Sequence, residues 1–154
     1  MKKITTITLC TILVSSCTGS SDKGYSEEKD RKMVFEILEN LDSHTLDIDE
    51  KMSVSSEDIV HMAQGNHAIT NLEDLRAMFI EERNWGHSEM KHEAFEIYSF
   101  DDHVIVRGGV KGIWYSKEGN NQMPFKTNNL ITLKRTEDGE LKIWHVIFNS
   151  TEEE

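Results

Sequence analysis

Two patterns of hydrophobic positions divide the chain into a helical first half and a strand-rich second half. Between residues 26 and 44, apolar side chains recur every three or four positions, which predicts an amphipathic helix. A second helix is expected to begin at Asn71, a favourable N-cap, and to end near Gly86. Residues 59–63, between the two helices, have the composition of a strand.

After Gly86 the pattern changes to strands. Four segments rich in branched and aromatic residues are separated by turns of Asp, Asn and Gly: 95–100, 104–115, 125–133 and 141–148. Helices followed by a meander of strands predict an α+β fold, with helices packed on one face of a curved antiparallel sheet. Such a sheet, closed by helices, forms a cone whose mouth is a natural site for a small molecule.

The chain begins with a predicted lipoprotein signal peptide, residues 1–16. Lys2 and Lys3 precede an uncharged apolar run that is too short to span a bilayer, which needs roughly 20 residues. The sequence Val14-Ser15-Ser16-Cys17 resembles a lipobox, in which the cysteine thiol receives a diacylglycerol. We therefore expect cleavage before Cys17 and a lipid anchor on that cysteine. A plain secretory signal with a free thiol is the alternative.

The rest of the chain divides into three predicted parts. Residues 17–25 form a flexible polar tether, residues 26–150 one domain, and residues 151–154 an acidic tail. Because Cys10 lies in the signal peptide, only Cys17 is left and no intramolecular disulfide is expected.

The charge balance restricts the partners of the domain. The chain has 28 acidic and 17 basic residues and a net charge of −11, which disfavours binding to nucleic acid. Acidity also repels anionic headgroups, so the domain should stand off the membrane. The expected location is the bacterial cell envelope, with the choice of leaflet left open. His87 and His92 are not spaced as a metal pair, and neither a metal nor another cofactor is expected.

Three short segments, 56–62, 69–76 and 142–150, resemble the SnoaL-like and DUF4440 domains of the NTF2-like superfamily. The resemblance covers roughly residues 33–150 and implies an NTF2-like cone and homodimers formed through the sheet. The superfamily includes steroid isomerases and polyketide cyclases that use an aspartate base. In this sequence that position falls near His61 or Met62, so the resemblance does not extend to the catalytic aspartate.

Three polar residues of the expected strands are candidates for the site. His61 has apolar neighbours and is either a general base or a hydrogen-bonded residue of the wall. Arg107 and Asn129 lie in the middle of strands, where each is either a ligand contact or an exposed residue of the outer face; exposure is the favoured interpretation.

The last predicted strand has two possible orientations. Alternation places His145 and Asn149 on one face and Trp144 on the other, together with Phe148. Either the first face lines the pocket with polar groups, or the second lines it with aromatic rings. A shift of one residue in register would exchange the two answers.

These observations support three hypotheses. The first is a lipid-anchored NTF2-like module that binds a small apolar ligand or a protein partner without turnover. The second is an isomerase or cyclase that uses His61 or His145. The third is an assembly role through homodimers.

Overall fold

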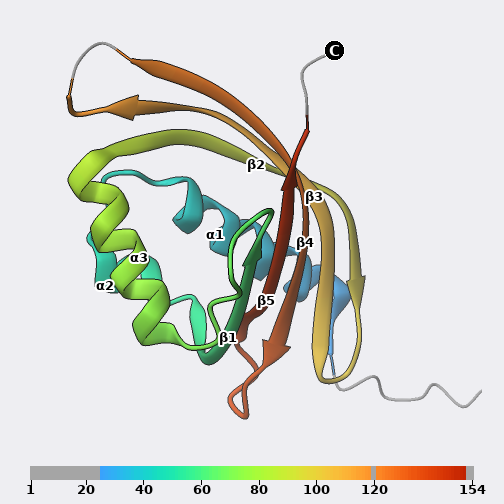
Figure 1. Ribbon diagram of the computed structural model, residues 1–154. Coiled ribbons are helices and arrows are strands. Elements are labelled where there is room, and N and C mark those ends of the chain that lie inside the picture. Colours follow the sequence, from blue (N-terminus) through green and yellow to red (C-terminus); the bar gives the residue numbers. More distant parts are fainter. Residues whose placement is uncertain (1–24, 119–120, 152–154) are drawn as a thin grey trace, which may run out of the picture.

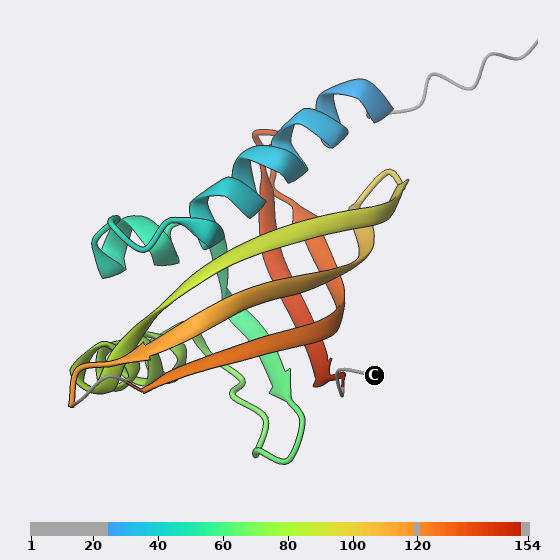
Figure 2. The ribbon, with the colours of Figure 1, turned by 90° about the horizontal axis from the view of Figure 1, so that it is seen from above.

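The computed structural model describes residues 25–118 and 121–151 and shows a strongly curved sheet with helices packed inside the curve (Figures 1 and 2). The elements, in chain order, are α1 (Glu27–Asp42), α2 (Ile48–Met52), β1 (Ser55–Ala63), α3 (Leu72–Trp85), β2 (Gly86–Ser99), β3 (His103–Ser116), β4 (Gln122–Arg135) and β5 (Leu141–Ser150). Cys17 and residues 152–154 lie outside the described residues, so the signal, the anchor and the tail stay predictions.

The five strands form one sheet in the order β1-β5-β4-β3-β2. Strands β2 to β5 are antiparallel neighbours, as the meander predicted. Strand β1 joins the edge in parallel with β5, with His61 opposite Val146. The parallel pairing joins segments far apart in sequence, and such pairing leaves no local signal in either of them.

Side-chain caps fix where the helices begin. The Asn71 side chain accepts a hydrogen bond of 2.8 Å from the amide of Asp74, so α3 begins where the sequence predicts. Helix α2 was not expected, although its signature is present: Asp47 and Glu50 form a reciprocal capping box. At five residues, α2 is too short for its hydrophobic pattern to be recognised.

The core lies between the helices and the inner face of the sheet. Its most buried apolar members are Val34, Ile59, Leu75, Val104, Val106, Leu133 and Ile143. The sheet bends where β2 has a bulge between Ala94 and Glu96, opposite Gly108. A Cβ atom at Gly108 would lie 2.2 Å from the carbonyl oxygen of Glu93, so only glycine permits this close approach of β2 and β3.

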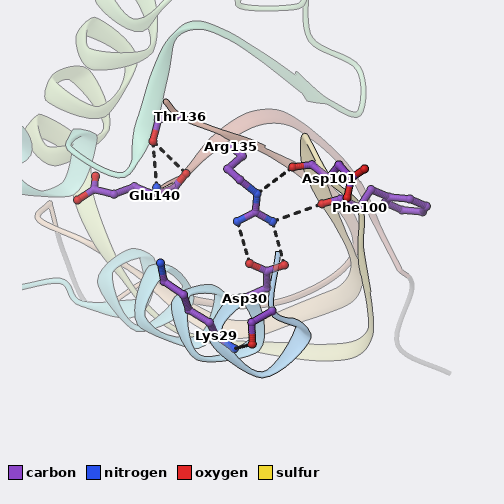
Figure 3. A network of polar contacts seen from close by, with 8 residues as sticks. Lys29, Asp30, Phe100, Asp101, Arg135, Thr136 and Glu140 are labelled. Atoms are coloured by element: carbon purple, nitrogen blue, oxygen red, sulfur yellow. Dashed lines mark hydrogen bonds and ion pairs between the residues drawn. The ribbon is translucent and has the colours of Figure 1, made fainter. Parts of the chain in front are cut away.

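A buried ion pair joins the start of α1 to the end of β4 (Figure 3). Two guanidinium nitrogens of Arg135 donate to the two carboxylate oxygens of Asp30, each over 2.9 Å, and Asp30 is fully buried. Arg135 also donates to the carbonyl oxygens of Phe100 and Asp101, in the turn between β2 and β3. Among the described residues, no helix is long and apolar enough to cross a membrane.

Candidate functional site

A cleft opens between α2, α3 and the first half of β2. The space between its walls is about 450 Å³, including the open solvent at its mouth. Its apolar wall consists of Ile48, Met52, Phe79 and Met90. Its polar lining consists of His44, Lys51, Glu82, Arg83, His87 and Ser88. The cleft therefore combines an apolar wall with several groups that can bind a polar substituent.

Regular local geometry brings these side chains together. On α3, Phe79, Glu82 and Arg83 are three and four positions apart, so they share one face of the helix. On β2, alternation directs Ser88 and Met90 to the inner face. The capping box stabilises the first turn of α2, and Ile48, Lys51 and Met52 of this helix line the cleft.

Lys51 is the buried cation of the cleft. Its side chain is 7% exposed, and its ammonium donates to the carbonyl oxygen of Ser43 over 3.3 Å. The ammonium also lies 5.7 Å from the centre of the Phe79 ring. Burial lowers the pKa of Lys51, and the nearby carboxylate of Glu82 opposes that shift.

One step further along the inner face of β2, His92 is paired with Asp42 at the end of α1. Nδ1 of His92 lies 2.6 Å from an oxygen of Asp42, and the backbone N–H of His92 donates to the same oxygen over 2.9 Å. The two side chains are 9% and 11% exposed. Burial lowers the pKa of His92, while the hydrogen bond to Asp42 raises it. The imidazole is therefore neutral at pH 7, with its Nδ1 proton directed to Asp42 and Nε2 left as a base.

His92 also borders a second, smaller cavity of about 180 Å³. Asn129, one of the residues predicted from the sequence, borders the same cavity and is 8% exposed. Its side-chain oxygen accepts a hydrogen bond of 2.6 Å from the hydroxyl of Thr127. Asn129 therefore belongs to the inner face, and the exposed position favoured from the sequence is wrong for this residue.

His61 also faces the interior. Its ring makes an edge contact with Phe148, with 5.2 Å between the ring centres, and burial lowers its pKa. Among the described residues, no carboxylate lies within hydrogen-bond distance of the His61 ring. This environment is that of a residue in the wall of the cone.

A bulge decides the orientation of β5. Thr132 of β4 pairs with His145, and Leu133 pairs with Ile143, so Trp144 is the extra residue. The extra residue reverses the inward and outward alternation of side chains along β5. Each of the two orientations predicted from the sequence therefore holds on one side of the bulge. Ile143, Val146 and Phe148 face the interior, while His145, Ile147 and Asn149 face outward. The Trp144 ring lies against His145, with 4.0 Å between the ring centres.

Arg107 lies on the outer face. Its Nε donates to the carboxylate of Glu96 over 2.7 Å, and this bond lowers the pKa of Glu96 to about 2. The guanidinium also lies 5.7 Å from the centre of the Phe95 ring. Its partners are therefore residues of the surface.

The residues proposed from the sequence thus fall into two groups. His61 and Asn129 face the interior, whereas Arg107, His145 and Asn149 face outward. Neither these five residues nor Trp144 borders the larger cleft. The residues that sequence reasoning missed are Asp42, Lys51 and His92. A carboxylate at the end of a helix opposes the helix dipole, so Asp42 carried a weak signal of another role.

Within residues 25–118 and 121–151, no cluster of three or more His, Cys, Asp or Glu side chains could hold a metal ion.

Comparison with known protein families and with curated proteins finds no match for this chain. Solved structures do match. A ketosteroid isomerase-like protein from Erwinia carotovora atroseptica SCRI1043 superposes with a TM-score of 0.72 at 17% identity, covering 84% of this chain and 100% of that one. A conserved protein from Planctomyces limnophilus DSM 3776 has a TM-score of 0.70 at 15% identity, covering 81% and 95%.

A third structure is that of an enzyme. The hexachlorocyclohexane dehydrochlorinase LinA-type3 from Novosphingobium barchaimii LL02 has a TM-score of 0.66 at 15% identity, covering 81% of this chain and 88% of that one. At such identities the likeness is one of fold. It confirms the α+β cone predicted from the sequence.

Proposed function

The chain has the NTF2-like fold, and on that premise we propose that it is a lipid-anchored protein of the bacterial cell envelope that binds a small molecule. The ligand occupies the cleft between α2, α3 and β2. The observation that carries this proposal is the composition of the cleft, four apolar side chains beside a set of polar groups, which is typical of small-molecule sites.

Binding in the cleft is tested by filling it. Met90→Trp places a larger side chain among the apolar lining and should abolish the binding of small organic ligands. Met123→Trp is the matched control, since Met123 is 55% exposed and does not line the cleft. Protein-observed NMR with a library of small neutral and charged ligands gives the readout. Ligands that bind both variants equally well would contradict the proposal.

The anchor is tested on the membrane fraction. Mass spectrometry of the N-terminal peptide should show a diacylglycerol on Cys17, and Cys17→Ala should release the protein from the membrane. Cys10→Ala is the control, because that residue lies in the signal peptide that we expect to be removed. An unmodified Cys17, or a Cys17→Ala protein that stays with the membrane, would refute the anchor.

The second candidate function is catalysis by the Asp42–His92 pair. The observation that favours it is the 2.6 Å contact, which holds a neutral imidazole in the orientation that suits a general base. Turnover of an isomerisation or elimination substrate should then disappear in His92→Gln and persist in His145→Gln, which alters an outward-facing residue. Turnover that survives His92→Gln would exclude this mechanism.

Binding without turnover is the better supported of the two. The cavity beside His92, about 180 Å³, is less than half as large as the cleft between α2, α3 and β2, about 450 Å³ by the same measure. The larger cleft has more room for a ligand, but His92 does not line it. A substrate in that cleft would therefore lie away from the imidazole.

A further inference from the structure

We propose that the cleft selects a small carboxylate with an apolar body, and that its anionic group binds to the ammonium of Lys51 and the guanidinium of Arg83. This inference rests on the proposed binding function and names the chemical class of the ligand.

Lys51 is a buried cation that lacks an acidic partner. Although the side chain is 7% exposed, no carboxylate of the described residues lies within 4.0 Å of its ammonium. Within that part of the chain the ammonium makes a single hydrogen bond, to the Ser43 carbonyl, and so has two further protons to donate. A buried charge is costly unless it is paired, and a bound anion would supply the pair.

Arg83, on α3, is a second cation of the cleft lining that lacks an acidic partner among the described residues. Its guanidinium donates to the carbonyl oxygen of Leu46 and forms no ion pair with a described residue. A guanidinium has five N–H donors and binds carboxylates through two of them at once. Most of the Arg83 donors are therefore left for a ligand.

Unpaired cations at this place are unusual for such an acidic chain. Elsewhere most cations of the strands have carboxylate partners, for example Lys111 with Glu93, Arg107 with Glu96, and Arg135 with Asp30. The other cations without an ion pair among the described residues, such as Lys117 and Lys126, are exposed to water. Lys51 and Arg83 are instead partly or fully buried, and both line the cleft.

The neighbouring acids are already engaged. An oxygen of Glu82 accepts a hydrogen bond of 3.3 Å from the Ser88 hydroxyl, and Asp42 accepts from His92 and from Lys91. The lining thus carries two cations and one carboxylate, an excess of one positive charge. The charge of the lining therefore fits a monoanion.

The apolar wall of the cleft determines which chemical group the rest of the ligand should carry. Phe79 and Met52 lie beside Lys51, while Ile48 and Met90 complete the apolar lining. His87, also in the lining, is stacked on Tyr115 of β3, with 5.1 Å between the ring centres. An aromatic or branched apolar group would cover this wall while its carboxylate reaches Lys51.

A series of matched probes tests the charge directly. Hexanoate, benzoate, phenylacetate and indole-3-acetate are each compared with the corresponding neutral amide by protein-observed NMR on the folded protein. We expect at least one carboxylate to bind about tenfold more tightly than its amide, the factor expected for one added hydrogen bond between charged groups. The shifted signals should include those of Met52, Phe79 and Met90.

Substitutions show which cations bind the carboxylate of the ligand. Lys51→Met and Arg83→Met should each remove most of the preference for the carboxylate while leaving the affinity for the amide unchanged. Lys126→Met is the matched control, because it removes the same charge from an exposed position on β4. Thermal unfolding of each variant verifies folding; replacing the buried ammonium of Lys51 by a methionine should not lower the melting temperature.

The outcomes separate this inference from the proposed function. If the amides bind in the cleft as tightly as the carboxylates, the cleft is a binding site and the selection for an anion is wrong. If Lys126→Met weakens carboxylate binding as much as Lys51→Met does, the preference is a general charge effect and the inference also fails. If no member of either series shifts the cleft signals at about 10 mM, both the inference and the proposed function are contradicted.

Discussion

His61 and His92 are held inside the curve of the sheet, and burial lowers the pKa of each below its ordinary value of 6.5. The unfolded chain therefore binds more protons than the folded protein when the pH falls below about 6.5. Stability from these two residues is fully present above that pH. It is lost as the pH falls toward the pKa values of the folded state.

This linkage predicts the effect of His61→Phe. The wild-type free energy of unfolding should fall between pH 6.5 and 5, by up to about 1.4 kcal/mol per pH unit for each titrating histidine. The variant has one histidine fewer, so its stability should fall less steeply. Urea unfolding at several pH values measures both slopes. Equal slopes for the two proteins would mean that His61 does not contribute to the acid sensitivity.

The individual site residues show the limit of prediction from sequence. His61 was recognised because a histidine among apolar residues of a strand is conspicuous. His92 was considered only as a possible metal ligand with His87, since its true partner, Asp42, is 50 positions away. Lys51 looked like an ordinary charged residue, because its burial depends on α2 and α3 closing over it. Contacts of this kind are determined by tertiary packing alone.

Among the elements, α1 is attached to the sheet by the ion pair between Asp30 and Arg135 (Figure 3). Arg135→Leu would leave the fully buried carboxylate of Asp30 without its partner. Removal of one member of a buried pair costs about 3–5 kcal/mol, and we expect a loss of that size in the free energy of unfolding. Chemical denaturation at pH 7 is the measurement.

The matched control for this prediction is Arg107→Leu. Arg107 also pairs with a carboxylate, that of Glu96, but the two side chains are 54% and 42% exposed. Water screens such a pair, so the loss of stability should be clearly smaller than for Arg135→Leu. Similar losses for the two variants would show that burial does not set the strength of the Asp30 pair.

Whole elements were predicted more completely than the site. Both long helices appear within two residues of their predicted ends, because capping residues and periodicity are local signals. Strand β2 is much longer than predicted: its first half, residues 86–94, is polar on its outer face and contains few branched residues. The bulges on β2 and β5 were not located, since a bulge depends on how two strands pair. These bulges decide which side chains face the cone.

For the whole molecule, α1 sets the distance between the predicted tether and the cleft. The helix is 16 residues long, which corresponds to about 24 Å. Asp30, in its first turn, is paired with Arg135 of the sheet, close to where the described chain begins. Its last residue, Asp42, lies near Lys51 in the lining of the cleft. The cleft therefore lies near the end of α1 that is opposite the start of the described chain.

The outer face of the sheet provides the last prediction. Leu130 and Ile147 are direct neighbours in the β4–β5 pairing and are 43% and 44% exposed, and Phe95 and Tyr98 on β2 are also about half exposed. We propose that two copies of the chain pair through this face, in keeping with the homodimer expected from the sequence. Leu130→Glu would place a charge in the centre of the paired surface.

Light scattering coupled to size-exclusion chromatography tests this pairing. The wild-type protein should have about twice the mass of one chain, and Leu130→Glu should have the mass of a monomer. Ile80→Glu is the control, because Ile80 on α3 is 38% exposed but lies away from the outer face of the sheet. A wild-type monomer would refute the dimer, and loss of pairing in both variants would place the contact elsewhere. Because the cleft lies on the opposite side of the sheet, ligand binding should be equal in the monomeric and dimeric forms.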